Sequence, residues 1–269
     1  MWRSWKLIQK AGLMTLTGLL ALGGMAGPVS GQEAMPPSSP QASGSPHAAS
    51  TIETKMGGEE EVAHPFFTHM GVPEAVGVFN LRLAALATRD DGETTGDFAF
   101  HFETGLTDFI GLHVRNDMFR DMPRTEAMFQ FAAVKSKNGM SGFSPLIEFE
   151  IPTRSVDGTW INTLVGFSSA LANSRAAFNQ VIHYSPAEEM VDGSVSFVWR
   201  VGRRFFPVVE VLGEAMHGEG PVINVLAGLK MRVNAHLILG VALQVPTTSN
   251  KDFSSQLVFQ PDMEWGRAR

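Results

Sequence analysis

The sequence predicts an all-β protein: an antiparallel transmembrane β-barrel of about 12 strands, preceded by a signal peptide and a disordered linker. From Gly77 onward, apolar and polar residues alternate at every second position, which separates them onto the two faces of a strand. Several of these segments reach the ~10 residues with which a tilted strand crosses a bilayer. Charged residues make up 18% of the chain, below the ~25% that is usual in soluble domains.

The N-terminus reads as a targeting segment. Three basic residues among the first ten precede an uncharged, mostly apolar run over 11–27, which is the pattern of a secretory signal peptide. We therefore predict a signal peptide over 1–31. The alternative is a transmembrane anchor, although the run is at the short limit for a helical span.

Residues 32–62 are rich in Pro, Ser, Ala and Gly and nearly lack large apolar side chains. Such a segment cannot bury enough surface to offset the entropy lost on ordering. We predict a disordered linker here and an outer-membrane β-barrel over 63–269. Residues 32–70 are also the predicted contact for a periplasmic partner.

Six segments alternate cleanly. In the first of them, Phe98, Phe100 and Phe102 share one face, and His101 and Glu103 share the other. The six segments are 97–104, 109–118, 146–151, 194–201, 223–234 and 236–245. Less regular candidates are 77–87, 125–136, 159–170, 177–185, 206–216 and 254–264. Tight turns are predicted at 105–108 and 234–235, and longer polar loops at 90–93, 119–124, 152–158 and 186–193, an alternation typical of outer-membrane barrels.

The polar face separates a barrel from a soluble β-sandwich. It carries small residues such as Gly111, Gly228, Gly240 and Ala242, which suit the crowded inside of a closed sheet. It also carries charges of both signs, which are able to pair across strands. The residues predicted to line the lumen and act in transport are Arg82, His101, Glu103, His113, Arg115, Glu148, Glu150, Arg200, Glu210, Glu214, Lys230 and Arg232.

Two finer predictions concern this face and the strand ends. A hairpin turning near Glu219 places Glu210 close to Lys230 inside the barrel, and Leu229 outside it. Aromatic residues near strand ends predict girdles at the membrane interfaces. These residues are Phe66, Phe67, Phe119, Trp160, Phe178, Phe205, Phe206, Phe253 and Trp265.

Composition limits the function classes. The net charge of -6 argues against a nucleic-acid partner. The absence of cysteine excludes disulfides, thiolate metal sites and a Cys nucleophile. The chain has no phosphate loop, dinucleotide fingerprint or haem-attachment motif. We therefore expect no cofactor and no enzymatic activity.

Two histidine motifs leave alternatives open. His64 and His69 lie within one short segment beside Met70, and their side chains suit Cu or Zn. The commoner alternative is an amphipathic segment whose Phe residues touch the membrane interface. His183 and Ser185 share a strand face, as a barrel lipase would require, but we identify no acid at the same depth on a neighbouring strand.

The last strands carry a resemblance. Residues 240–246, 251–253 and 256–260, together with 102–108 and 143–153, resemble a family of bacterial outer-membrane proteins regarded as transporters. That family is similar to proteins tied to phenol-degradation pathways. The resemblance covers roughly 71–265. It implies a pore or transporter and supplies no established catalytic residues.

Together these observations predict an outer-membrane channel or transporter that passes small solutes through a polar, charge-lined lumen. Its expected partners are outer-membrane lipid, a small-molecule solute and a periplasmic protein. One alternative is a partner or sleeve for a periplasmic redox or metal-handling system. The other is a barrel lipase.

Overall fold

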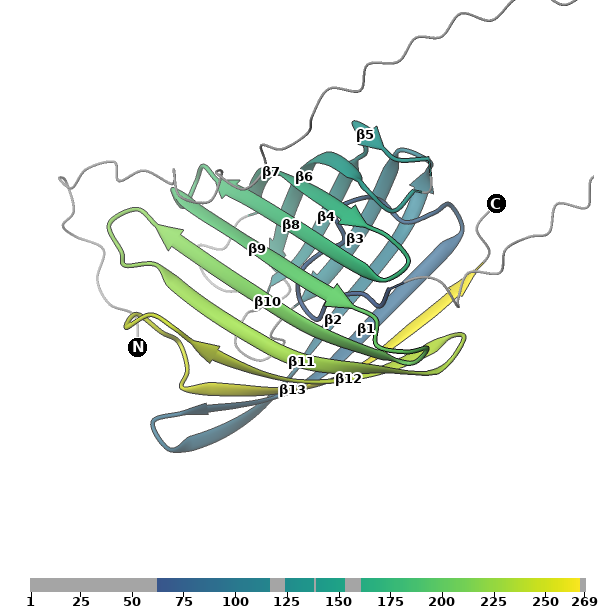
Figure 1. Ribbon diagram of the computed structural model, residues 1–269. Helices are drawn as coiled ribbons and strands as arrows, with labels where there is room; N and C mark the ends of the chain where they lie inside the picture. The colour runs from purple at the N-terminus through teal and green to yellow at the C-terminus, as the bar shows by residue number, and fades with distance from the viewer. Residues whose placement is uncertain (1–61, 117–123, 138, 153–160, 267–269) are drawn as a thin grey trace, which may run out of the picture. The chain divides into compact units, whose positions relative to one another are not determined.

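The computed structural model describes residues 62–116, 124–137, 139–152 and 161–266. Within these ranges the chain forms strands and no helix (Figure 1). None of the described residues belongs to a helix that would cross a membrane. The strands are β1 (Val78–Asp90), β2 (Glu93–Thr107), β3 (Ile110–Asn116), β4 (Arg124–Phe131), β5 (Val134–Lys135), β6 (Gly142–Pro152), β7 (Asn162–Ala172), β8 (Ala176–Ser185), β9 (Met190–Trp199), β10 (Phe205–Met216), β11 (Val222–Asn234), β12 (Leu237–Pro246) and β13 (Ser255–Gly266).

The strands close into one antiparallel barrel. Neighbours in sequence pair with one another, β1 pairs with β13, and β4 pairs with β6. The two-residue β5 lies beside β6 and takes no part in the closure. Twelve strands therefore form the wall, as the alternation predicted.

The turn between β1 and β2 differs from its prediction. The sequence predicted a longer polar loop at 90–93, but β1 ends at Asp90 and β2 begins at Glu93. Asp91 and Gly92 have φ angles of 44° and 87°. Asp and Gly tolerate this left-handed conformation, which makes a two-residue hairpin turn. The predicted loops at 119–124 and 152–158 fall largely outside the described residues.

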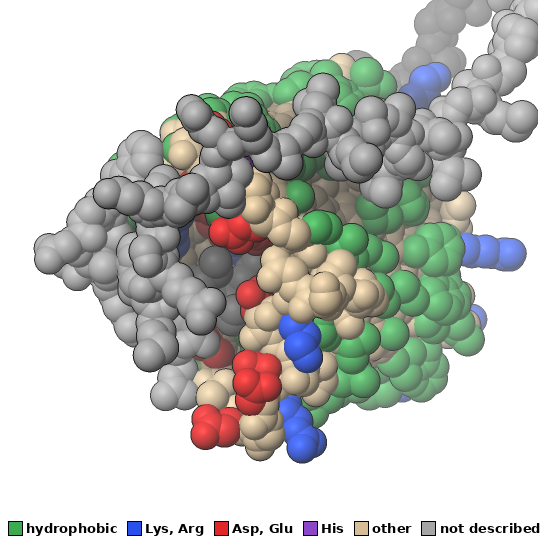
Figure 2. Space-filling view, turned by 90° about the vertical axis from the view of Figure 1, so that its left-hand side faces the viewer, with side chains coloured by type: hydrophobic (Ala, Val, Ile, Leu, Met, Phe, Trp, Pro, Cys, Tyr) green, Lys and Arg blue, Asp and Glu red, His purple; other side chains and the backbone are tan. Residues whose placement is uncertain are grey.

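The two faces of the wall differ as predicted. On β11, Leu226 and Lys230 are buried, whereas Leu229 and Met231 are 45% and 39% exposed. Figure 2 shows hydrophobic side chains covering much of the wall, with charged ones toward the edges of this area. Outward-facing hydrophobics come from strands all around the barrel, among them Phe98, Phe143, Val165, Phe197, Val241 and Phe259. An apolar outer wall around a polar interior is the arrangement of an outer-membrane β-barrel.

The segment that precedes β1 fills the lumen. We call Val62–Pro73 the plug. Its side chains Phe66, Phe67, Thr68 and His69 are all buried, and the segment lies within the ring of strands (Figure 1). The predicted barrel over 63–269 thus contains two parts, because its first residues occupy the lumen and the wall begins at Val78.

Small inward residues make room for the plug. A Cβ on Gly228 would lie 2.6 Å from the ring of Phe66, and a Cβ on Gly240 would lie 2.8 Å from the same ring. Both distances are shorter than any real Cβ contact. The crowded lumen predicted from these glycines is present, and an aromatic side chain of the plug is what crowds it.

The predicted aromatic girdle is wrong for four of its residues. Phe66, Phe67, Phe206 and Phe253 are buried inside the barrel. They are apolar contacts of the lumen, and the sequence alone does not separate these from interface residues. The remaining described members, Phe178, Phe205 and Trp265, are at least 36% exposed. Trp265 stacks on Phe79. Phe119 and Trp160 lie outside the described residues.

Candidate functional site

One carboxylate holds the centre of the plug. Glu210 Oε1 accepts a hydrogen bond from the backbone N–H of Phe66. Its Oε2 accepts from the backbone N–H groups of Phe67 and Thr68, at 3.1 and 2.8 Å, and from the Thr68 hydroxyl at 2.8 Å. Hydrogen bonds to an ionised acceptor are roughly twice as strong as those between neutral groups. Glu210 therefore fixes the plug backbone over three consecutive residues.

Two cations hold carbonyl groups of the same stretch. Arg82 Nη1 and Lys230 Nζ both donate to Pro65 O, at 3.0 and 2.9 Å. Lys230 also donates to Gln260 Oε1 at 2.8 Å and to Asp262 Oδ2 at 2.7 Å. Its ammonium group lies 4.5 Å from the centre of the Phe66 ring. These buried cations find their partners in the plug and in neighbouring strands, as burial requires.

The second half of the plug is fixed to the opposite wall. Gln130 Nε2 donates to Met70 O at 2.9 Å, and Gly71 N donates to Asn179 Oδ1 at 3.2 Å. Lys135 Nζ donates to Pro73 O at 3.0 Å. The plug therefore crosses the lumen from β10, β11 and β13 to β4, β8 and β5.

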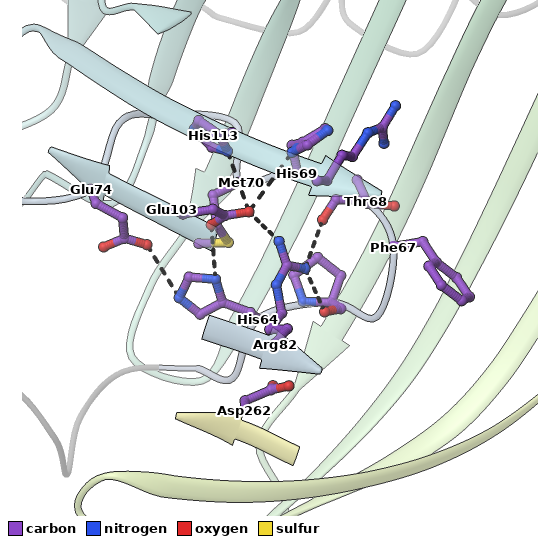
Figure 3. Close-up of polar contacts among 12 residues, drawn as sticks. His64, Phe67, Thr68, His69, Met70, Glu74, Arg82, Glu103, His113 and Asp262 are labelled. Atoms are coloured by element: carbon purple, nitrogen blue, oxygen red, sulfur yellow. Dashed lines mark hydrogen bonds and ion pairs between the residues drawn. The ribbon is translucent and has the colours of Figure 1, made fainter. Parts of the chain in front are cut away.

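The Glu103 carboxylate lies close to three histidine side chains (Figure 3). Its Oε1 lies 3.3 Å from His113 Nδ1 and 3.8 Å from His69 Nδ1, and it also pairs with Arg82. Its Oε2 lies 3.4 Å from His64 Nδ1. Both predicted metal-ligand candidates, His64 and His69, are thus brought to one buried carboxylate.

The two plug histidines have opposite electrostatic surroundings. Burial disfavours the charged form of His64, but the hydrogen bond to Glu103 and the charges of Glu74 and Glu103 outweigh it and raise the His64 pKa to about 9. Burial and the nearby Arg115 charge hold the pKa of His69 well below its usual range. His64 is therefore a cation at neutral pH, whereas His69 is neutral.

A cavity of about 560 Å³ lies on one side of the plug, whose Phe67 and His69 form part of its lining. We call this cavity the vestibule. Arg124 Nη1 lies 2.8 Å from Glu150 and 3.2 Å from Glu188. The vestibule is therefore lined by charges that pair with one another. Its charged lining includes Arg115, Arg124, Glu126, Glu150, Glu188 and Asp192.

The predicted lumen residues fall into three positions. Those buried around the plug are Arg82, His101, Glu103, His113, Glu148, Glu210 and Lys230. Those that line the vestibule are Arg115, Glu150 and the exposed Glu214. Arg200 and Arg232 lie toward the other end, where Arg200 donates to Ser174 O and Arg232 packs over the Phe206 ring. Asn179, Gln260 and Asp262 were not predicted, although they too lie on inward faces.

The predicted pairing of Glu210 with Lys230 is wrong. Lys230 lies opposite Phe206, and Glu210 lies opposite Leu226. The hairpin is centred on Gly218, whose φ is 86°. A pairing of Glu210 with Lys230 would need the centre at Gly220, two residues later, so the observed partner of Glu210 lies four residues earlier on β11.

The lipase alternative finds no support in the geometry. His183 and Ser185 are buried in the lumen. An acid does lie opposite His183, contrary to the sequence analysis: Asp192 Oδ1 is 2.7 Å from His183 Nδ1. The other ring nitrogen lies 3.5 Å from Glu148, and the Ser185 hydroxyl pairs with Asn162. The Ser185 hydroxyl is therefore not oriented for activation by this histidine.

No family model and no curated protein matches the sequence. Solved structures do resemble the fold. An outer-membrane channel from Pseudomonas putida F1 has a TM-score of 0.50 and 7% identity, over 72% of this chain and 98% of that one. The NanC porin has a TM-score of 0.49 and 5% identity, over 70% and 99%. At such identity the first likeness shows a shared barrel fold.

Proposed function

We propose that the protein is an outer-membrane channel for small solutes and that the plug closes it. The observation that carries the proposal is the kind of contact that holds the plug. Its backbone is bound by side chains of the wall, above all by Glu210, and the strand ladders include none of the plug residues.

The wall is complete without the plug. Each of the twelve strands has two strand neighbours, so the backbone hydrogen bonds of the barrel do not depend on residues 62–73. If the plug leaves, it uncovers the charged and polar groups that bind its backbone, together with an apolar cluster that includes Leu86, Phe206 and Leu226. A lumen of this kind conducts ions and polar solutes, and rings of charge set its selectivity.

The vestibule suggests the type of solute. Its lining combines apolar groups such as Phe67, Leu212 and Phe253 with charged pairs. A small ring or chain that carries one polar group would satisfy both kinds of surface. The sequence resemblance to proteins tied to phenol-degradation pathways makes phenol-sized aromatics the first solutes to test.

A role beside a periplasmic redox or metal-handling system is the second candidate. Two groups that share Glu103 favour it, since their side chains suit metals: His69 and His113 complete one, and His64 and Glu74 the other. Residues 62–69 of the proposed partner-binding stretch are buried in the lumen. A partner would reach them only after the plug has left.

Conductance tests the channel. The full chain and a variant lacking residues 62–70 would be inserted into planar bilayers after cell fractionation has located both in the outer membrane. We expect rare, small openings from the full chain and a steady conductance from the variant. Folding of the variant is checked by its heat-dependent migration in SDS gels. A folded variant without conductance would contradict the channel, and recovery of the full chain in the soluble periplasmic fraction would contradict the membrane location.

A further inference from the structure

Three side chains converge where the plug meets β2 and β3. Ligand atoms of His69, Glu103 and His113 all lie within 4.8 Å of one another, and the three residues are buried. Glu103 and His113 are direct partners in the β2–β3 register, whereas His69 comes from the plug (Figure 3). Two imidazoles and a carboxylate form a ligand set that first-row divalent metals take in proteins.

The distances are close to those of a metal site. Zn–ligand bonds of about 2.0–2.1 Å place tetrahedral ligand atoms about 3.4 Å apart. Glu103 Oε1 already lies 3.3 Å from His113 Nδ1 and 3.8 Å from His69 Nδ1. Small side-chain rotations would bring all three atoms to bonding distance, with water in the remaining position.

The tautomer of His113 is set by its other partner. Gln130 Nε2 donates to Met70 O and to Ser168 Oγ, so the amide oxygen is the atom that faces His113. That oxygen lies 3.1 Å from His113 Nε2, which must therefore donate. The other ring nitrogen, Nδ1, faces the Glu103 carboxylate 3.3 Å away. The position between them therefore takes a cation, either a proton or a metal ion.

His69 supplies the second, independent observation. It is 1% exposed, and neither of its ring nitrogens has a hydrogen-bond partner among the described residues. Buried polar atoms in native proteins are nearly always paired. The ring packs edge-on against His113, with centroids 5.1 Å apart, and this arrangement holds Nδ1 toward Glu103.

Outer partners already orient the carboxylate. Arg82 pairs with Glu103 Oε1, and His64 lies 3.4 Å from Oε2. Metal-binding carboxylates and histidines in proteins are commonly held by hydrogen bonds of this kind. Arg82, His64 and Gln130 would be the positioning residues of such a site.

We propose that His69, Glu103 and His113 bind a divalent transition-metal ion, with Zn²⁺ as the representative. One ligand comes from the plug and two from the wall, so the bound ion joins the two parts. By linkage, an ion that binds only the plugged state stabilises that state. This last consequence rests on the proposed function, whereas binding itself is measured without any channel assay.

Cobalt titration tests the site. The purified full chain in detergent, stripped with EDTA, is titrated with Co²⁺ and followed by its visible d–d absorption. We expect one ion per chain, in low-coordinate geometry, displaced by Zn²⁺. His69→Gln and His113→Gln should each weaken binding at least ~100-fold, and Gln130→Leu should weaken it by ~10–100-fold, as outer partners do.

The exposed histidines supply matched controls. His217→Gln and His236→Gln change loop residues outside the cluster and should bind as the unaltered chain does. His47→Gln controls for the imidazole upstream of the plug. Heat-dependent gel migration confirms that each variant is folded. Whether the site binds a metal ion at all is decided with the full chain alone. If no d–d bands appear at millimolar Co²⁺, the site binds no such ion and the proposal is wrong. Unchanged binding in the two ligand variants would also overturn the site.

Discussion

The wall around the plug and the vestibule carry the same types of charged side chain, but these side chains lie in different surroundings. Around the plug, Arg82, Glu210 and Lys230 are wholly buried and bond to backbone atoms of one segment. In the vestibule, Arg124 and Glu150 are partly exposed and bond to each other. Removing one partner of a buried charge costs several kcal/mol, whereas exposed pairs contribute little. The first region therefore fixes a conformation, and the second remains accessible to solutes.

The largest effect is expected from Glu210→Ala. The change leaves three backbone N–H groups and one hydroxyl of the plug without their acceptor, and we expect it to destabilise the plugged state by about 3–5 kcal/mol. Conductance in planar bilayers should rise toward that of the variant lacking residues 62–70. Glu214→Ala is the matched control, because Glu214 lies on the same strand face but is exposed. Equal effects of the two changes would erase the distinction between the regions.

Leu229→Arg tests whether the outer face of the wall contacts lipid, in contrast to the plug-binding region and the vestibule inside. Leu229 faces outward beside the buried Lys230, and a basic residue facing lipid near the midplane costs ~2–4 kcal/mol. Assembly yield and urea stability in bilayers should both fall. Ala235→Arg, in the exposed turn after β11, should leave both unchanged. Normal assembly of Leu229→Arg would invert the assignment of faces.

Gly228→Ala sharpens the comparison on the plug side. The added methyl group would meet Phe66 and Ala242 at 2.6 Å, and overpacking of this kind typically costs ~1–3 kcal/mol. We expect the plug to shift and protease access to residues near Phe66 to increase. Gly96→Ala adds the same group where the nearest atom is 3.9 Å away. Protection identical to the unaltered chain would mean that the plug does not fit as described.

The smallest effect on stability belongs to the vestibule. Arg124→Glu removes a partly exposed ion pair and should change stability by less than about 1 kcal/mol. In the variant lacking residues 62–70 it should nevertheless shift ion preference toward cations, because it reverses a charge in the lining. Reversal potentials in a salt gradient measure this. A stability loss as large as that of Glu210→Ala would show that the two regions are not distinct.

The wall was predictable because its pattern is local. Because the outer face contacts lipid and the inner face is polar, apolar and polar residues alternate within each strand. The sequence of β11 alone therefore predicts that Lys230 faces inward and Leu229 outward. The register was less predictable, because each one-residue change in the centre of a hairpin changes every cross-strand partner by two residues, and the hairpin of β10 and β11 is centred on Gly218. The sequence predicted which residues of the candidate site face inward. It did not predict which of these residues contact one another.

The plug was not predictable for a physical reason. Phe66 and Phe67 have the composition of an interface segment, and nothing adjacent to them in the sequence indicates the acceptor that binds them. That acceptor, Glu210, lies 144 residues beyond Phe66. The glycines at 228 and 240 were the available signal. They indicated that something fills the lumen and could not indicate what.

The plug and its partners are far apart along the chain. Thr68 contacts Glu210 across 142 residues, Pro65 contacts Lys230 across 165, and Phe66 contacts Gln260 across 194. Contacts of this separation form late, because the loop that they close must first be ordered. Closure of the barrel is equally non-local, since it pairs Val78 with Gly266. Plugging and closure therefore both depend on strands near the C-terminal end of the described chain.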